Sequence, residues 1–204
     1  MHREILSKEQ LELLPLLEMA SRKFGLVGGT AVALQIGHRR SIDFDLFSYK
    51  EFKNNILRQK VERLAKITKT IVNKSGELTF MTNDVKVTFF NFTYEIEYKK
   101  SFDKIIKMPD LLTLAAMKAF ALGQRAKWKD YVDLYFIMKD FHTCKEIAKK
   151  SEKLFGAHFN EKLFRVQLSY LDDVNYDEEV EYLPGFAVSD DVVKKALIEF
   201  ALEK

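Results

Sequence analysis

The sequence has little of what cross-linked, irregular or membrane-spanning proteins need. One cysteine, Cys144, occurs in 204 residues, which excludes an internal disulfide bond and a thiolate metal cluster. Only 8 glycines and 3 prolines are present, so few irregular stretches are expected. The first residues lack a signal-peptide pattern, and no apolar run reaches the length of a membrane span. These absences predict a cytoplasmic protein without a membrane partner.

The composition is that of a globular protein with a substantial core. Hydrophobic residues make up 47% of the chain and include 17 phenylalanines, which is ample for burial and argues against disorder. The net charge of +3 is too small to indicate nucleic-acid binding by itself. Its distribution is uneven, because Val166–Val193 contains no lysine or arginine and many acidic residues. This segment is either a surface for a partner or an ordinary solvated acidic surface.

The most informative stretch is a glycine pair followed by two carboxylates. Gly28 and Gly29 let a backbone approach a phosphate closely because neither has a Cβ atom. Asp43 and Asp45 lie in the apolar run Ile42–Phe47, which predicts a strand with both acids on one face. Two neighbouring carboxylates repel unless a cation lies between them, and Mg²⁺ is bound by such groups together with substrate phosphates. The alternative for the glycine pair alone is a plain strand-to-helix turn.

Hydrophobic periodicity and turn residues predict an α/β half followed by a helical half. Ser7-Lys8-Glu9-Gln10 has the form of a capping box, and Pro15 predicts a kink or restart in the helix that follows. Further helices are expected over Thr30–Ile36, Tyr49–Lys66, Leu111–Leu122, Lys127–Lys139, Cys144–Phe155, Asn160–Tyr170 and Asp190–Leu202. Strands of a mostly antiparallel or mixed sheet are expected over Phe24–Val27, Ile42–Phe47, Ile67–Val72, Leu78–Thr82 and Val85–Phe92. The predicted organisation is an α/β lobe, residues 1–100, packed on a helical lobe, residues 101–204.

A second group of charged residues lies in the helical half. Lys118 stands inside an otherwise apolar helix, which is unfavourable unless the ammonium meets an anion or reaches water by snorkelling. Asp130 and Asp133 are three residues apart and share one face of the next helix. Helix capping or salt bridges to Arg125 and Lys129 are the structural alternative for these two acids.

These motifs resemble those of a known family. The glycine pair, with Asp43-Phe44-Asp45 thirteen residues beyond Thr30, is similar to the signature of polymerase-β-like nucleotidyltransferases. With Gly37–Asp45 and Lys118–Leu134 added, the pattern resembles the AbiEii-type nucleotidyltransferase toxins of type IV toxin–antitoxin systems. The resemblance covers about residues 24–138 and implies a nucleotidyltransferase-like mixed sheet, with an active site in a cleft shared by two lobes.

The resemblance also implies a role for each matching residue. Asp43 and Asp45 would bind Mg²⁺, while Lys118 would contact the triphosphate and Asp130 would activate or orient the acceptor hydroxyl. The residues implied in nucleotide binding are Gly28, Gly29, Thr30, Arg39, Arg40, Ser41, Lys118 and Arg125. The implied reaction is transfer of a nucleotide from an NTP to a hydroxyl, on tRNA or another RNA, by a toxin with a cognate antitoxin.

One position departs from the family pattern. Thr88 stands about where a third carboxylate is usual, so activation of the acceptor would fall to Asp130. Two other hypotheses for the function of the protein therefore stay open. The first is a catalytically degenerate nucleotidyltransferase that binds nucleotide or a partner without turnover. The second is a pure interaction protein that binds no Mg-NTP, with the acidic segment as its partner surface.

Overall fold

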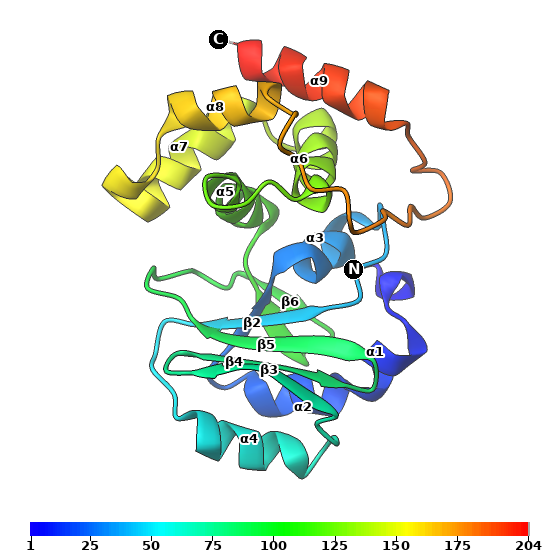
Figure 1. Ribbon diagram of the computed structural model, residues 1–204, viewed down its shortest axis with the longest axis vertical. Coiled ribbons are helices and arrows are strands. Elements are labelled where there is room, and N and C mark those ends of the chain that lie inside the picture. Colours follow the sequence, from blue (N-terminus) through cyan, green and yellow to red (C-terminus); the bar gives the residue numbers. More distant parts are fainter. Residues whose placement is uncertain (204) are drawn as a thin grey trace. The chain divides into compact units, whose positions relative to one another are not determined.

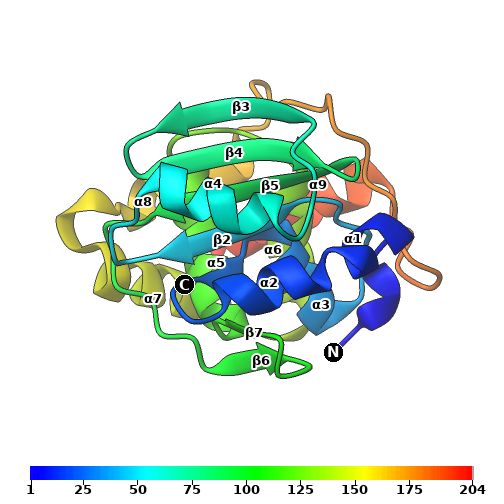
Figure 2. The ribbon, with the colours of Figure 1, turned by 90° about the horizontal axis from the view of Figure 1, so that it is seen from below.

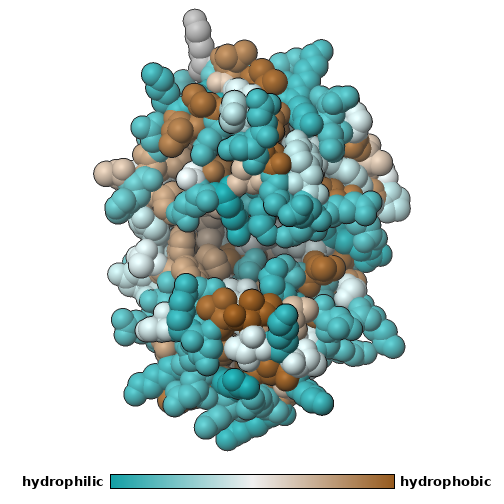
Figure 3. Space-filling model, viewed as in Figure 1, coloured by the Kyte–Doolittle hydropathy of each residue, from teal (hydrophilic) through white to brown (hydrophobic). Residues whose placement is uncertain are grey.

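The computed structural model describes residues 1–203, which form two compact units that divide between Asp110 and Leu111. Figure 1 shows strands and helices in the first unit and helices in the second. On the face drawn in Figure 3, hydrophilic side chains predominate, with separate groups of hydrophobic side chains exposed among them. Within residues 1–203, every helix is too short or too polar to cross a membrane.

The first unit is built on a five-stranded mixed sheet with the strand order β1-β2-β5-β4-β3. Its strands are β1 (Gly25–Val27), β2 (Phe44–Ser48), β3 (Lys69–Lys74), β4 (Glu77–Thr82) and β5 (Val85–Asn91). Its helices are η1 (Arg3–Ile5), α1 (Lys8–Glu12), α2 (Leu14–Ala20), α3 (Gly28–Ile36) and α4 (Asn54–Glu62). Strands β2 and β5 pair in parallel and the other neighbours are antiparallel, which confirms the predicted mixed sheet.

The two faces of this sheet differ in polarity. Helices α2 and α4 cover one face (Figure 2). Phe44 and Leu46 of β2 and Val87 and Phe89 of β5 are completely buried, and the ring of Phe89 packs against that of Phe24, which follows α2. Alternation along each strand turns the intervening residues to the opposite face, where α3 lies (Figure 1). Asp45 is one of these intervening residues, so the sheet's apolar face anchors the strand while the acid stays partly accessible.

Local signals at the N-terminus act as predicted. The hydroxyl of Ser7 accepts from the backbone N–H of Gln10, and the Gln10 side chain accepts from that of Ser7, completing the capping box. Helix α2 restarts at Leu14, with Pro15 in its first turn, where a missing N–H group costs no hydrogen bond.

Several predicted boundaries in the first unit were wrong, among them those of β3, which spans Lys69–Lys74 instead of Ile67–Val72. Helix α3 includes the glycine pair instead of following it, with Val27 as its N-cap. Strand β2 begins at Phe44, because the carbonyl of Asp43 accepts a hydrogen bond from the Thr30 hydroxyl. Asp43 therefore precedes the strand that holds Asp45. The helix expected over Tyr49–Lys66 spans only Asn54–Glu62, since a turn in which Lys50 N–H donates to Ser48 Oγ follows the strand.

A small hairpin was missed. Strands β6 (Lys100–Phe102) and β7 (Ile106–Met108) pair with each other, and their residues Phe102, Ile106 and Met108 are buried in the first unit. Each strand has three residues, too few for periodicity to be visible. The two-lobe division at residue 100 stays a prediction, and the structure's own compact units divide ten residues later.

The second unit is helical. It contains α5 (Leu111–Leu122), α6 (Trp128–Asp140), α7 (Cys144–Phe155), η2 (Gly156–His158), α8 (Glu161–Ser169) and α9 (Asp190–Leu202). The predicted bounds of α5, α7 and α9 are confirmed, and those of α6 and α8 differ by one residue at each end. A capping box at Thr143 and Glu146 fixes the start of α7, and Cys144 is buried beside it.

Candidate functional site

Gly28 brings the start of α3 against a carboxylate. Val27 pairs with Asp45 in the β1–β2 register, so the strand end and the acid are neighbours. Gly28 has a φ of +70°, and a Cβ atom built on it would lie 2.3 Å from Asp45 Oδ2. Any other residue would strain the backbone and displace this carboxylate. The glycine is therefore required by the position of Asp45 as well as by the turn.

Gly29 is required by a second close contact. A Cβ atom on Gly29 would lie 2.6 Å from Arg39 Nη2 and 3.1 Å from Ser41 Oγ. Arg39 is only 2% exposed, and its Nη1 donates to the carbonyl of Arg40 at 2.8 Å. The basic loop after α3 thus folds back onto the glycine pair and places a guanidinium beside the first turn of the helix.

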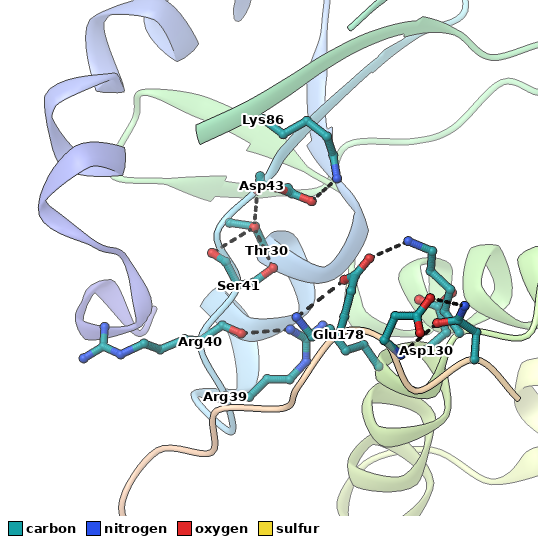
Figure 4. Close-up of polar contacts among 12 residues, drawn as sticks. Thr30, Arg39, Arg40, Ser41, Asp43, Lys86, Asp130 and Glu178 are labelled. Atoms are coloured by element: carbon teal, nitrogen blue, oxygen red, sulfur yellow. Dashed lines mark hydrogen bonds and ion pairs between the residues drawn. The ribbon is translucent and has the colours of Figure 1, made fainter. Parts of the chain in front are cut away.

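Thr30 holds the connection that leads to the first acid. Its hydroxyl donates to the carbonyl of Asp43 and lies 2.9 Å from Ser41 Oγ (Figure 4). The carbonyl of Ser41 also accepts from Gln10 Nε2 at 2.9 Å. Thr30 is 2% exposed, so its hydroxyl serves the protein's own loop in this structure. The role implied by resemblance, contact with a phosphate, stays a prediction.

Asp43 is paired with a lysine that sequence reasoning missed. Lys86 Nζ of β5 lies 2.5 Å from Asp43 Oδ2, and the two side chains point toward one another (Figure 4). Their side chains are 35% and 30% exposed. The only sequence signal was the alternation of β5, which puts Lys86 and Thr88 on one face. The strand pairing needed to place that face beside Asp43 is absent from the sequence.

The register also locates the position of the missing acid. Asp45 and Thr88 are direct partners in the parallel β2–β5 pair, so their side chains start from adjacent positions on the same face. The Thr88 hydroxyl lies 3.5 Å from that of Thr79 on β4. A neutral hydroxyl therefore stands next to Asp45, where a carboxylate would be a third hard oxygen ligand.

The second unit contains a buried charge cluster. Lys118 Nζ of α5 lies 2.5 Å from Asp130 Oδ1 and 2.7 Å from Asp133 Oδ2, both on α6. These three side chains are 8%, 6% and 0% exposed. Lys118 therefore does not reach water by snorkelling, because two carboxylates hold its ammonium inside the unit. The i, i+3 spacing of the two acids presents both to one cation.

Arg125 adds a fourth charge at the edge of this cluster. Its Nε lies 3.3 Å from Asp130 Oδ2, and its side chain is 58% exposed. Of the two salt bridges that were the structural alternative for these acids, the one from Arg125 is present, while Lys129 pairs instead with Glu178 at 3.5 Å. Two cations and two carboxylates leave the cluster formally neutral. Burial, with smaller contributions from Asp173 and Asp130, raises the pKa of the adjacent Tyr131 to about 12, so this phenol is neutral at physiological pH.

The acidic segment has a structural role in the second unit. Glu178 pairs with Lys127 Nζ at 2.6 Å, and the carbonyl of Asn175 accepts from the N–H of Trp128 at 3.0 Å. The segment therefore caps the start of α6, and Figure 4 shows Glu178 of the segment and Asp130 of the helix.

Arg40 is the remaining residue that the resemblance implies in nucleotide binding. Its Nη1 donates to the carbonyl of Glu4 at 3.4 Å.

The donor chemistry suits a cation that also binds phosphate. No group of three or more His, Cys, Asp or Glu side chains suited to a metal exists among residues 1–203. Asp43 and Asp45 offer two partly exposed carboxylates, which is the number Mg²⁺ takes when phosphates supply further oxygens. Gly28, which lies against the Asp45 carboxylate, is also the first residue of α3, and a helix N-terminus favours anions.

Comparisons with known proteins agree with this reading of the residues. The family model described as nucleotidyl transferase AbiEii toxin, type IV TA system, matches residues 20–197. The uncharacterized protein aq_aa25 of Aquifex aeolicus (strain VF5) is 28% identical over 202 residues, covering 96% of this chain and 97% of the relative.

Two solved structures have a similar fold. JHP933 from Helicobacter pylori is 18% identical with a TM-score of 0.61, covering 96% of this chain and 91% of the other. MenT4, the nucleotidyltransferase toxin Rv2826c from Mycobacterium tuberculosis H37Rv, is 12% identical with a TM-score of 0.57, covering 96% and 85%. At these identities the likeness is one of fold.

Proposed function

The chain belongs to the AbiEii family of nucleotidyl transferase toxins, and on that premise we propose that it transfers a nucleotide from an NTP to a hydroxyl on RNA, with Mg²⁺ as cofactor. One observation carries the proposal. The Asp45 carboxylate lies against Gly28 at the N-terminus of α3, where a Cβ atom would come within 2.3 Å of it. A phosphate-binding helix start and a metal-binding acid thus share one place in the first unit.

We assign Asp43 and Asp45 to the metal. When bound, Mg²⁺ would bridge phosphate oxygens and neutralise the charge that develops on them. The first N–H groups of α3, at Gly28 and Gly29, would bind the triphosphate, and Thr30 and Ser41 keep the loop before Asp43 in place.

The basic residues would position the phosphates. Arg39 is buried against Gly29, so its guanidinium is fixed in orientation, which favours bidentate recognition of phosphate. Arg40 and Arg125 would contact phosphate or RNA. Lys118 would contact the triphosphate, and for that its ammonium must share its charge between Asp130, Asp133 and the nucleotide.

Asp130 is the proposed residue that orients the acceptor hydroxyl and accepts its proton. It is held by Lys118 at 2.5 Å and Arg125 at 3.3 Å, which fixes the orientation of the carboxylate. A carboxylate so paired is oriented to accept a hydrogen bond from the acceptor hydroxyl.

The proposed partners follow from the same family. An NTP is the donor, tRNA or another RNA is the acceptor, and a cognate antitoxin is the regulatory partner. NTPs and tRNA are both present in the cytoplasm, so we propose that the protein acts there.

A transfer assay tests the proposal. Purified protein is incubated with each α-³²P-labelled NTP, Mg²⁺ and total tRNA, and label on RNA is measured beside Asp43→Asn, Lys118→Met and the exposed control Lys69→Met. We expect label from one or more NTPs with the wild type and the control, and none with the other two variants. Absence of label in all reactions would contradict the proposal, as would label that survives in Asp43→Asn.

A second candidate function is nucleotide binding without turnover. It is favoured by Thr88 beside Asp45 and by the lysine that already occupies Asp43. Calorimetry separates the two candidates, because this one predicts Mg-NTP binding with no transfer to any acceptor. The absence of Mg-NTP binding would leave only an interaction protein.

A further inference from the structure

The ion pair between Asp43 and Lys86 involves a carboxylate that the proposed function assigns to the metal. Lys86 Nζ lies 2.5 Å from Asp43 Oδ2, which is direct contact between the charged atoms. An ammonium in contact with this oxygen opposes the binding of Mg²⁺ to the same carboxylate, because the two cations repel. We propose that Lys86 is a built-in competitor for the metal at Asp43 and that it moves to the nucleotide's phosphates when the metal–nucleotide complex binds. This inference rests on the proposed function and deepens it.

The position of Lys86 is fixed by the centre of the sheet. Strand β5 lies between β2 and β4, and Phe44 pairs with Val87 in the parallel register. Asp43 and Lys86 each come one residue before this pair, so their backbones are neighbours at the same end of the two strands. The pair therefore depends on strand register, unlike a contact between two long side chains on a mobile surface.

The strength of the pair suits displacement. Both side chains are about one-third exposed, and ion pairs with such access to water are weak. A divalent ion accompanied by phosphates can replace an interaction of this size. The lysine then has a new anionic partner, since a triphosphate carries several negative oxygens. When the metal binds without nucleotide, Lys86 gains no phosphate partner. Its displaced ammonium then stays close to the metal ion, which repels it.

Lys86 should therefore weaken the binding of the bare metal more than that of the metal–nucleotide complex. In the metal-free protein it also balances the charge of Asp43. The consequence is that the site loads its metal chiefly together with the nucleotide.

Binding of Mn²⁺ measured by electron paramagnetic resonance tests this without any turnover. The proteins are the wild type, Lys86→Met, the charge-retaining Lys86→Arg, the metal-site variant Asp43→Asn, and Lys69→Met, which removes an exposed lysine from the edge strand β3. Each is titrated alone and with α,β-methylene NTP analogues, and thermal melting establishes that each is folded. For Lys86→Met we expect bare Mn²⁺ to bind about tenfold more tightly, a change of about 1.4 kcal/mol. Lys69→Met and Lys86→Arg should stay near the wild type.

The nucleotide arm completes the test. With the analogues present, the advantage of Lys86→Met should vanish or reverse, because the lysine has become a phosphate contact. Unchanged or weaker bare Mn²⁺ binding in folded Lys86→Met, beside weaker binding in Asp43→Asn, would overturn the role of Lys86 and leave the metal site standing. Mn²⁺ binding that is absent, or indifferent to Asp43→Asn, would overturn the proposed metal site and this inference together.

Discussion

Lys118 and Asp133 form an ion pair of 2.7 Å in which the carboxylate side chain has no exposed surface. Replacing one member of a buried pair leaves the other without its counter-charge, which costs about 3–5 kcal/mol. Asp133→Asn should therefore lower the free energy of unfolding by about 3 kcal/mol, since Lys118 keeps Asp130 as a partner. Urea denaturation measures the change.

A matched control lies on the same helix. Asp140 is an exposed residue at the end of α6, and Asp140→Asn should change the free energy of unfolding by less than about 0.5 kcal/mol. Equal effects of the two substitutions would show that Asp133 is not a structural counter-ion of Lys118.

Gly28→Ala should abolish binding at the first unit's site with only a modest loss of stability. Gly28 and Gly76 have similar positive φ values of +70° and +77°, so alanine at either position strains the backbone by about 1–2 kcal/mol. Only at Gly28 does the new methyl group meet a carboxylate, at 2.3 Å, whereas at Gly76 the nearest atom is Asn91 Cβ at 3.4 Å.

The prediction compares both variants in Mn²⁺–nucleotide titrations and in urea. Gly76→Ala should have a modestly lower free energy of unfolding and bind Mn²⁺–nucleotide like the wild type. Gly28→Ala should show the same modest loss of stability and no Mn²⁺–nucleotide binding. Intact Mn²⁺–nucleotide binding in Gly28→Ala would mean that binding does not depend on the present position of the Asp45 carboxylate.

The elements that sequence predicted well are those with a strong local signal. Helices α5, α7 and α9 have long amphipathic or apolar patterns and clear end signals, such as the capping box at Thr143. The glycine pair, the two acids and the Lys118 cluster were also visible, because each is a short run of unusual residues.

What sequence could not supply is the pairing of distant segments. Lys86 is an ordinary alternating residue of β5 until the parallel register places it beside Asp43. Asp133 was one of several acids on α6, and only helix packing shows that it and Asp130 share Lys118. The loss of Asp43 from the strand depends on a hydrogen bond from Thr30, thirteen residues away.

Thr88→Asp should strengthen metal binding. Thr88 is the direct β2–β5 partner of Asp45, so a carboxylate there would lie beside the two existing acids and offer a further hard oxygen. We expect Mn²⁺ to bind several-fold more tightly than to the wild type and label transfer to increase. Thr88→Asn, of equal size and without charge, should do neither. Weaker Mn²⁺ binding in folded Thr88→Asp would place the metal away from this pair.

Cys144 should be unreactive in the native protein at neutral pH. Burial raises the pKa of its thiol from 9.0 to about 11, and the side chain is 1% exposed. Because the reactive species is the thiolate, the raised pKa keeps the thiol protonated until the solution approaches pH 11. Labelling with a disulfide reagent at pH 8 should be slow in the native protein and complete in urea. Rapid native labelling would contradict burial at the start of α7.

Fragments of the chain test where the first unit ends. The hairpin β6–β7 buries Phe102, Ile106 and Met108, which are 0–1% exposed. Residues 1–110 should therefore unfold cooperatively, whereas residues 1–100 should be destabilised by several kcal/mol, since each large apolar side chain removed costs about 2–5 kcal/mol. Thermal melting followed by circular dichroism compares the two. Equal melting temperatures would support a boundary at residue 100 and make the hairpin a linker.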